Sequence, residues 1–313
     1  MRAIRVHEFG GPEVLGLEEV PRPEPAPGAD EVLVRVQAAG VNPVDTYIRA
    51  GAYGTLPALP YTPGSDAAGI LVDSEERVYL SGSLSGTYAE YTLCRRDQVH
   101  HLPDGLTYAQ GAGLGAPYAT AYRALFQRGR AVAGERLLIH GATGGVGLAA
   151  VQFALAAGLQ VYATAGSTGG SELVASQGDV QVFDHNDPEH LADIVEHTGD
   201  DGLDLILELR AADNLGWDLT ALAPEGRVVV VGSRGRVEVD ARDLMMAEGS
   251  VIGVFLNNAT PDELLEAHAA VAEGLRSGTV RPVVGRELPL EEAPRAHGIL
   301  TERPALGKMV LVP

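Results

Sequence analysis

The stretch of the chain with the most definite chemical meaning is a glycine-rich segment, Leu137-Leu138-Ile139-His140-Gly141-Ala142-Thr143-Gly144-Gly145-Val146-Gly147. An aliphatic strand that runs through such a turn into an apolar-faced helix is typical of dinucleotide-binding folds. Gly144 lets the backbone approach a pyrophosphate, and Gly147 lets the helix pack close to the strand. Gly145 and Val146 would offer free N–H donors to the anion. The segment therefore predicts a phosphate-binding turn.

The nature of the nucleotide depends on the end of the next strand, where an Asp or Glu would bind the ribose hydroxyls and repel a 2′-phosphate. Gly166 and Ser167 are uncharged, and no acid follows them before Glu172, which favours NADPH. No Lys or Arg stands beside them, so His185 is a candidate partner for the phosphate. Ala142 replaces the first glycine of the usual pattern, and a glycine-rich turn without a ligand remains the alternative.

The elements that must position these residues are short aliphatic runs that begin near Arg136. Several runs are almost continuously apolar, as strands covered on both faces should be, and helix-length segments separate most of them. Six runs are the number that a doubly wound Rossmann sheet requires. They are Arg136–His140, Gln160–Ala165, Val180–Phe183, Leu203–Leu209, Arg227–Val231 and Ser250–Phe255.

The first third of the chain is instead β-rich. Arg2–His7 and Glu31–Ala38 alternate apolar and polar residues, as half-buried strands do, and Gly40–Gly69 is expected to be a loop rich in turn residues. The strand-like end Gly307–Val312 is expected to rejoin this β-rich part. We therefore predict an α/β protein whose β-rich domain comprises residues 1–118 and 279–313, with a Rossmann domain over 119–278.

Composition limits the possible partners of the chain. Its 313 residues carry a formal net charge of −19, which repels nucleic acid and anionic lipid. Cys94 is the single cysteine, so an internal disulfide and a cysteine-rich zinc site are excluded. We find no signal peptide and no membrane-length apolar run. A cytoplasmic protein is the expectation.

Several long motifs in a fixed order make the chain resemble the zeta-crystallin-like quinone oxidoreductases of the medium-chain dehydrogenase/reductase superfamily. The resemblance covers nearly the whole chain and implies a GroES-like β domain, a Rossmann domain, NADPH and a cleft between the domains. The motifs are Val41–Arg49, Pro60–Asp66, Pro117–Leu125, the Gly141–Gly147 turn and Val230–Gly235.

The resemblance also implies cofactor contacts, to which the residues themselves add Ser167. Some of these segments follow the predicted fifth and sixth strands, at the strand ends where an open sheet binds its ligand. Thr120 would lie near the nicotinamide. The full set of expected cofactor-binding residues is Tyr47, Thr120, Thr143, Gly144, Gly145, Val146, Gly166, Ser167, His185, Asn214, Val231, Gly232, Ser233, Arg234, Val254, Phe255 and Leu256.

The expected catalytic residues lie in the segment that, by the resemblance, faces the nicotinamide. Asn42 offers an amide, and Tyr47 and Tyr53 offer phenolic hydroxyls beside flat rings. We predict that Asn42 and Tyr47 orient the substrate and stabilise an oxyanion, while Tyr53 shapes the slot. Asp45 and Arg49, four residues apart, are expected to form a local ion pair.

No catalytic metal is expected. A zinc site of the alcohol dehydrogenase type needs a thiolate, an imidazole and usually an acid in one place. Cys94 is far along the chain from Asn42, and Gly64-Ser65-Asp66 stands where the zinc enzymes have a His-Glu pair.

The resemblance leaves other functions open. The alternative enzymatic function is reduction of an enone or enoyl substrate with NADPH. A distant alternative is a non-enzymatic role, as an RNA-binding or structural crystallin-like protein, which the negative charge disfavours. A homodimer or homotetramer is implied by the resemblance, with the Ser250–Phe255 strand as a candidate for extending the sheet.

Overall fold

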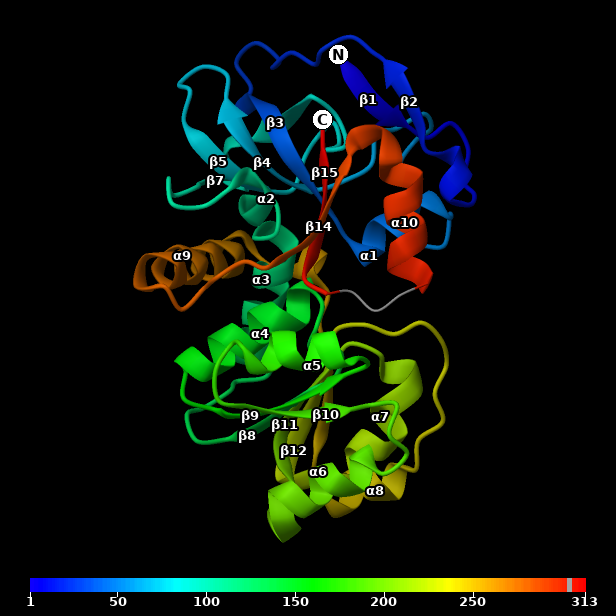
Figure 1. Cartoon of the computed structure of the whole chain (residues 1–313), viewed down its shortest axis with the longest axis vertical. Coiled ribbons are helices and arrows are strands. Elements are labelled where there is room, and N and C mark those ends of the chain that lie inside the picture. The colour runs from blue at the N-terminus through cyan, green and yellow to red at the C-terminus, as the bar shows by residue number, and fades with distance from the viewer. Residues whose placement is uncertain (303–305) are drawn as a thin grey trace. The chain divides into compact units, whose positions relative to one another are not determined.

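A computed structural model describes residues 1–302 and 306–313 and divides the chain into two compact units. The β-rich unit comprises Met1–Ala116 and Pro282–Pro313, and the Rossmann unit comprises Pro117–Arg281. The chain passes from the first to the second within helix α3, Gly115–Tyr122. Figure 1 labels the elements of both units.

The β-rich unit contains a sheet in the order β14-β15-β3-β4-β5-β7, in which β6 also pairs with β3, and a separate hairpin of β1 and β2. Most neighbours are antiparallel, but β14 and β15 run parallel. Its strands are β1 (Arg2–Arg5), β2 (Gly16–Glu19), β3 (Glu31–Val41), β4 (Asp66–Leu71), β5 (Arg77–Ser81), β6 (Tyr91–Arg95), β7 (Val99–His101), β14 (Val284–Pro289) and β15 (Lys308–Val312).

The C-terminal strand rejoins this unit, as the sequence predicts, because β15 pairs antiparallel with β3. The prediction of a loop over Gly40–Gly69 is wrong at both ends, because β3 includes its first two residues and β4 begins at Asp66. Strand β3 runs on to Val41, and helix α1 (Pro43–Arg49) follows at once. A proline in its first turn and a capping box make so short a helix possible. The other helices of the unit are α2 (Tyr108–Gly111) and α10 (Ala293–Glu302).

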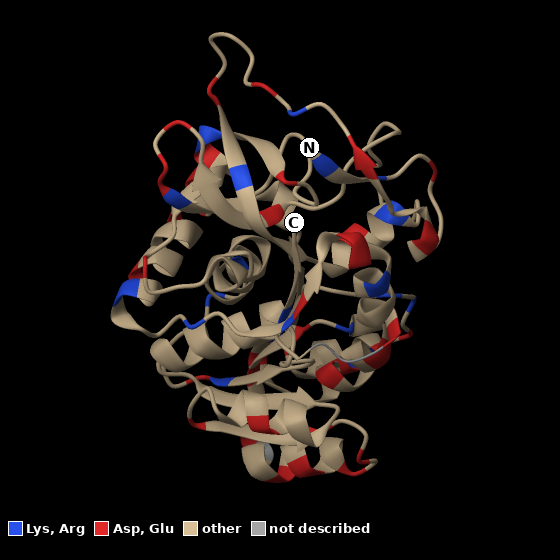
Figure 2. Cartoon of the chain, turned by 45° about the horizontal axis from the view of Figure 1, so that its top comes forward, with Lys and Arg blue, Asp and Glu red and all other residues tan. Residues whose placement is uncertain are grey.

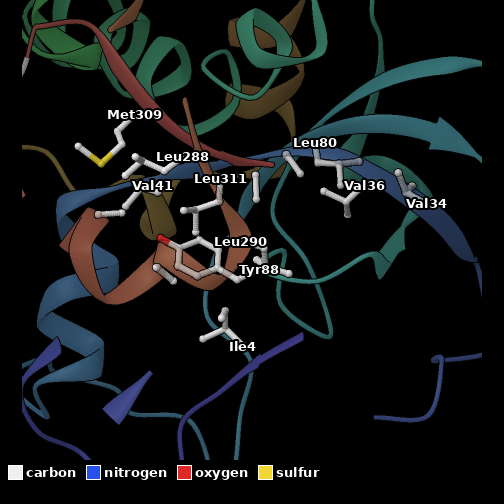
Figure 3. Packing of buried hydrophobic residues seen from close by; sticks show 14 of the residues in the cluster. Ile4, Val34, Val36, Val41, Leu80, Tyr88, Leu288, Leu290, Met309 and Leu311 are labelled. Carbon is white, nitrogen blue, oxygen red and sulfur yellow. The ribbon is translucent and has the colours of Figure 1, made fainter. Parts of the chain in front are cut away.

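The core of the β-rich unit joins segments from both ends of the chain. Figure 3 shows the Tyr88 ring among aliphatic side chains that include Ile4, Leu290 and Leu311. These four side chains are fully buried. Each buried aliphatic side chain contributes about 1.5–3 kcal/mol, so this packing ties the C-terminal strand to the N-terminal one.

The Rossmann unit is built on a six-stranded parallel sheet in the order β10-β9-β8-β11-β12-β13. This is the strand order of the doubly wound dinucleotide fold. All six predicted strands are therefore confirmed, with the predicted bounds for β9 and shifted ends for the other five. They are β8 (Arg136–Ile139), β9 (Gln160–Ala165), β10 (Val180–Asp184), β11 (Leu203–Glu208), β12 (Leu222–Val230) and β13 (Ser250–Gly253).

Helices cover both faces of this sheet: α4 and α5 lie on one side in Figure 1, and α6 and α7 on the other. The central strands β8 and β11 are fully buried over Leu137–Ile139 and Leu205–Leu207, which explains their continuous aliphatic sequence. The helices are α4 (Gly145–Ala156), α5 (Thr168–Ala175), α6 (His190–Thr198), α7 (Ala211–Thr220), α8 (Ala241–Met246) and α9 (Pro261–Ser277). A π-helical segment, Arg123–Arg128, extends α3.

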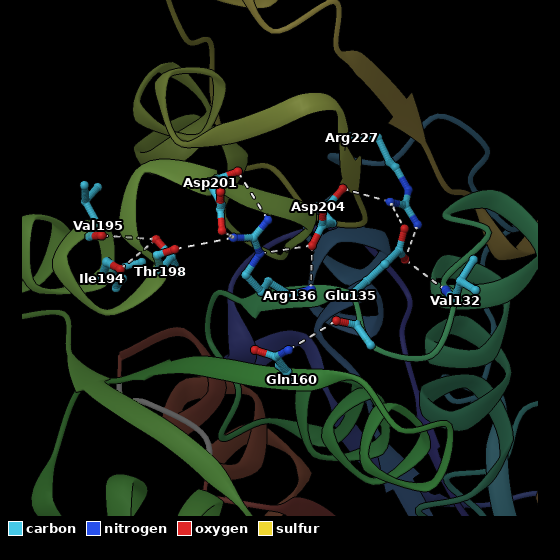
Figure 4. Close-up of polar contacts among 11 residues, drawn as sticks. Val132, Glu135, Arg136, Gln160, Ile194, Val195, Thr198, Asp201, Asp204 and Arg227 are labelled. Atoms are coloured by element: carbon cyan, nitrogen blue, oxygen red, sulfur yellow. Dashed lines mark hydrogen bonds and ion pairs between the residues drawn. The ribbon is translucent and has the colours of Figure 1, made fainter.

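Ion pairs connect residues near the amino ends of the parallel strands (Figure 4). Arg136 at the start of β8 bonds Asp204 and Asp201, and the Arg227 guanidinium on β12 bonds both carboxylate oxygens of Glu135, at 2.7 and 2.8 Å. Charge-assisted pairs of this kind are the stronger hydrogen bonds of a protein. They hold the edge of the sheet opposite to the one where a Rossmann fold binds its ligand.

Asp and Glu residues are distributed over elements of both units rather than gathered in one segment, as Figure 2 shows. Within the described ranges, none of the helices is both long and apolar enough to span a bilayer.

Candidate active site

The glycine-rich turn has the form that phosphate binding needs. Strand β8 ends at Ile139, Gly141 adopts a left-handed φ of 69°, and α4 begins at Gly145. The N-cap residue is Gly144, which has no side chain to occupy the N–H groups of the first helical turn. A Cβ on Gly147 would lie 2.6 Å from Ala142 Cα, so only glycine allows this close packing of helix and turn. The predicted roles of these glycines agree with this geometry.

Thr164 on the neighbouring strand holds the start of the turn. Its hydroxyl accepts a hydrogen bond from Gly141 N at 3.1 Å, and its carbonyl accepts one from Ala142 N, also at 3.1 Å. The turn is thus fixed to β9 before any ligand binds, which lowers the entropy cost of binding.

At the end of β9, Gly166 and His185 lie against each other. A Cβ on Gly166 would be 2.3 Å from His185 Nε2. Ser167 is the N-cap of α5, with its hydroxyl accepting from Gly170 N at 3.2 Å. Burial lowers the pKa of His185, and the charge of Arg210 lowers it further. Arg210, which sequence reasoning missed, therefore brings a permanent positive charge close to the predicted 2′-phosphate partner.

A pocket of about 580 Å³ opens at the carboxyl ends of β12 and β13. Five of the expected cofactor residues line it: Val231, Gly232, Ser233, Val254 and Phe255. The sequence did not predict the remaining lining residues, which are Arg123, Arg128, Val230, Gly253 and Asn258. The pocket lies at the sheet edge where an open α/β fold binds its ligand.

Behind the turn lies a buried cluster of three titratable side chains, which we call the acid–histidine cluster: His140, Glu208 and Asp218. His140 Nε2 is 3.0 Å from Asp218 Oδ1 and 3.9 Å from Glu208 Oε2, and all three residues are at least 98% buried. Burial raises the pKa of each acid to about 7 and lowers the pKa of His140. Asn214, an expected cofactor contact, hydrogen-bonds Glu208 with its side chain, so its amide is already engaged.

In the β-rich unit, Asn42 caps α1 and belongs to a second buried group, the lysine cluster: Asn42, Asp66 and Lys308. Asn42 Nδ2 donates to Asp66 Oδ2 at 2.8 Å. The Lys308 ammonium donates to Asn42 Oδ1 at 2.5 Å and to Asp66 Oδ2 at 3.3 Å. The Asn42 amide is thereby held in one orientation, and one of its two N–H groups has no partner in these bonds.

The predicted ion pair of Asp45 and Arg49 is wrong. Asp45 is the third residue of α1, and its Oδ2 accepts the Asn42 backbone N–H at 2.8 Å and the Tyr88 hydroxyl at 3.1 Å. Burial raises the pKa of Asp45 to about 6. The Arg49 guanidinium is buried, with Nη2 directed at the Thr46 carbonyl. The capping box uses the carboxylate that the i, i+4 spacing assigned to the arginine.

The two expected tyrosines lie close together in the chain but in different settings. Tyr47 is on α1 and Tyr53 is in the segment that follows it, and both are half-buried. Burial raises the pKa of the Tyr53 hydroxyl. Thr120, on α3, is also half-buried. These residues remain partly open to a ligand.

Comparison with known proteins places the chain in a family. The model of the alcohol dehydrogenase GroES-like domain matches residues 28–104, and that of the zinc-binding dehydrogenases matches 145–273. The chain is 48% identical to a quinone oxidoreductase of Rattus norvegicus, covering 100% of this chain and 98% of the relative. The corresponding Homo sapiens protein is 46% identical with the same coverage. The chain belongs to the quinone oxidoreductase family.

Solved structures agree with this membership of the medium-chain dehydrogenase/reductase superfamily. Escherichia coli quinone oxidoreductase complexed with NADPH superposes with a TM-score of 0.90 at 30% identity, and each chain is covered completely. A mycobacterial protein complexed with NADPH gives the same TM-score at 28% identity and the same coverage. The GroES-like and Rossmann folds expected from the sequence are confirmed.

The zinc named in one family model does not fit the residues of this chain. Asp66, where zinc enzymes have an acid, is hydrogen-bonded to an amide and an ammonium. The Cys94 thiol is buried against the Gly82 carbonyl at 3.7 Å, and burial raises its pKa to about 12. A protonated thiol and an ammonium are not zinc ligands. Among the described residues, the only group of three potential ligands is the acid–histidine cluster of the Rossmann unit.

Sequence reasoning missed Lys308 and the whole acid–histidine cluster. The contact of Lys308 with Asn42 spans 266 residues, and that of His140 with Asp218 spans 78. One sequence feature could have identified the first: Lys308 is the single lysine among 23 basic residues.

Proposed function

We propose that this protein oxidises NADPH and reduces a quinone. The observation that carries the proposal is the start of α4, where Gly144 leaves the helix N-terminus open behind a left-handed Gly141. A pyrophosphate is the natural ligand for such a site. The names of the most similar relatives and the NADPH complexes of two structural neighbours support the choice of reaction and cofactor.

In this proposal, different groups of the expected cofactor residues bind different parts of NADPH. Thr143 and the first turn of α4 would hold the pyrophosphate, and Gly166, Ser167 and His185 would face the adenosine phosphate. The pocket at Val231–Ser233 and Val254–Phe255 would take the nicotinamide half, near Thr120. Bound NADPH supplies a hydride, and we propose that its transfer takes place in the cleft between the two domains, as the resemblance implies.

The residues of α1 serve the substrate. The free N–H of the Asn42 amide would donate to the quinone oxygen that becomes negative, and the Tyr47 hydroxyl would make a second hydrogen bond. Tyr53 would pack against the flat ring. A quinone accepts hydride readily, so hydrogen-bond donors suffice.

The preference for NADPH over NADH follows from the charge near Gly166. His185 is neutral at pH 7 because its pKa is lowered, which leaves the positive charge to Arg210. Since Arg210 also pairs with Asp213 at 2.6 Å, we expect a moderate preference rather than an absolute one. Binding titrations with NADPH and NADH measure it, and Arg210→Ala should reduce the difference while leaving NADH affinity unchanged.

The activity test is oxidation of NADPH by a naphthoquinone, with an enone assayed beside it. Asn42→Ala and Tyr47→Phe should each lower kcat by about 100- to 1000-fold. Tyr91→Phe, on β6, is the matched control and should keep wild-type activity. Unchanged rates in both site variants would show that the site is misplaced, and faster turnover of the enone would make the protein an enone reductase.

We further propose a cytoplasmic location and a homo-oligomeric state, as the resemblance implies. Light scattering of the purified protein measures the second directly.

A further inference from the structure

The single lysine of the chain, Lys308, is buried beside Asn42, the residue that we assign to the substrate. The other 22 of the 23 Lys and Arg residues are arginines. Of those that the structure describes, Arg49 and Arg123 are buried and the rest are exposed or half-buried. Lys308 is 5% exposed, at the first position of β15. A sequence that uses arginine everywhere else has kept an ammonium at this one position, so the position has a requirement that a guanidinium does not meet.

The surroundings of Lys308 show what that requirement is. Its stem runs over two glycines: a Cβ on Gly40 would lie 2.8 Å from Lys308 Cε, and one on Gly113 would lie 3.4 Å from Lys308 Cγ. The passage admits a narrow alkyl chain that ends in a compact charge. A planar guanidinium is wider and presents its donors in a fixed fork, so it suits this passage less well than an ammonium.

The charge at the end of the stem meets two oxygens of different kinds. Asp66 is fully buried and already accepts the Ala116 N–H at 2.9 Å and the Asn42 amide at 2.8 Å. The ammonium completes this shell at Asp66 Oδ2 and makes its shorter contact, 2.5 Å, to Asn42 Oδ1. The longer contact, at 3.3 Å, pairs the ammonium with the Asp66 carboxylate. The shorter bond places positive charge on the oxygen of the amide that we assign to the substrate.

We propose that Lys308 is a positioning residue for quinone reduction, whose ammonium orients and polarises the Asn42 amide so that its free N–H stabilises the substrate oxyanion. This inference rests on the proposed function. Hydrogen bonds in a chain strengthen one another, so a cation on the amide oxygen makes the amide N–H a better donor. The ammonium thus supplies, through Asn42, the positive charge that a Lewis-acid metal supplies in other dehydrogenases.

In this proposal Lys308 gives no proton to the substrate. The hydride of NADPH brings two electrons and one proton to the quinone, which gives NADP⁺ and the hydroquinone monoanion. The monoanion then takes one proton from water and becomes hydroquinone. The Asn42 N–H and the ammonium behind it act only while the oxygen carries negative charge.

The test is Lys308→Ala with n-propylammonium, which replaces the missing end of the side chain, compared with 1-propanol, which has nearly the same shape without the charge. We expect kcat with a naphthoquinone to fall by about 100-fold with NADPH affinity unchanged. Propylammonium should restore at least a tenth of the lost rate, and propanol should restore none. Arg286→Met, on the adjacent strand β14, is the matched control and should behave as wild type.

The outcomes separate the two proposals. A wild-type protein that does not reduce quinones contradicts the proposed function, whatever the variant does. A wild-type protein that reduces them, together with an undiminished kcat in Lys308→Ala or equal rescue by propanol, overturns the role of Lys308.

A second measurement covers a variant that does not fold. Because the chain has one lysine, labelling with [ε-¹⁵N]lysine gives one ammonium resonance in the wild-type protein. We expect this resonance to shift when hydroquinone binds to the NADP⁺ complex, and to a smaller extent in Asn42→Ala. A resonance that does not respond to hydroquinone would mean that Lys308 serves Asp66 alone.

Discussion

The two units of this protein both bury carboxylates, and they compensate the buried charge in different ways. Each buries carboxylates next to a predicted ligand site: Asp66 in the lysine cluster, and Glu208 with Asp218 in the acid–histidine cluster. In the first, a lysine ammonium lies 3.3 Å from the acid. In the second, the nearest basic group is His140, whose pKa is lowered by burial. In the lysine cluster the acid is paired with an ammonium. In the acid–histidine cluster the raised pKa values favour protonated acids.

The difference predicts how each cluster responds to its surroundings. Removing one partner of a buried ion pair leaves an uncompensated charge, so the lysine cluster should be destabilised when either Asp66 or Lys308 is lost. Two acids whose pKa values burial raises to about 7 hold protons that the unfolded chain releases, so the acid–histidine cluster should respond to pH. The ion pair suits a fixed electrostatic role beside Asn42, while the acid–histidine cluster lies next to the phosphate-binding turn, which begins after His140.

The largest effect is expected from breaking the lysine cluster on one side only. Lys308→Met leaves the Asp66 carboxylate buried without its cation, which costs about 3–5 kcal/mol of stability. Adding Asp66→Asn removes the unpaired charge and should recover more than half of the loss. Urea unfolding followed by circular dichroism measures both variants. A double variant no more stable than the single one would show that the ammonium does not balance Asp66.

A smaller effect is expected in the acid–histidine cluster, and its sign follows from the pKa directions. The raised pKa values of Glu208 and Asp218 give stability that is full below about pH 4 and is lost as pH rises to about 7. The lowered pKa of His140 acts in the opposite sense below pH 6.5. Wild-type stability should therefore decrease by about 1–2 kcal/mol between pH 5 and pH 7.5, relative to a protein with one acid fewer.

Asp218→Asn tests this sign, because one raised acid and one lowered histidine then nearly cancel. The single tryptophan, Trp217, lies beside the cluster with its ring 6.1 Å from that of His140, so its fluorescence reports unfolding of this unit. The wild type minus the variant should show the predicted decrease between pH 5 and pH 7.5. Asp179→Asn, on the surface before β10, is the matched control and should follow the wild type. Parallel pH profiles for Asp218→Asn and wild type would contradict the assignment of bound protons to these two acids.

The comparison also shows where prediction from the sequence succeeds and where it stops. The Rossmann strands were predictable because strands buried on both faces leave continuous aliphatic runs, and the turn because Gly141 and Gly147 are required by backbone geometry. Helix α1 was missed because it is seven residues long, and its helical signal lies in capping by Asn42 and Asp45 rather than in apolar periodicity.

Neither buried cluster was predictable, since each depends on contacts between distant segments. Glu208 and Asp218 look like ordinary ends of a strand and a helix, and only the packing of α7 on the sheet brings them to His140. The amino-acid sequence does not show which of the buried acids forms an ion pair. Lys308 is the exception in part, because its uniqueness is visible in the sequence although its partners are not.

The smallest expected effect concerns Asp45, which lies in the unit with the cation but has no lysine bond of its own. Its Oδ2 accepts the Tyr88 hydroxyl at 3.1 Å, and its pKa is about 6. Tyr88→Phe should cost about 1 kcal/mol at pH 7.5, where Asp45 is ionised, and less at pH 5, where it is protonated. Tyr118→Phe, which loses a bond from its hydroxyl to the uncharged Gln152 at 2.8 Å, should cost the same at both pH values. Unfolding free energies at the two pH values measure the contrast. An equal cost of Tyr88→Phe at pH 5 and pH 7.5 would mean that Asp45 does not change its charge between them, and that neutralisation by protons is confined to the Rossmann unit.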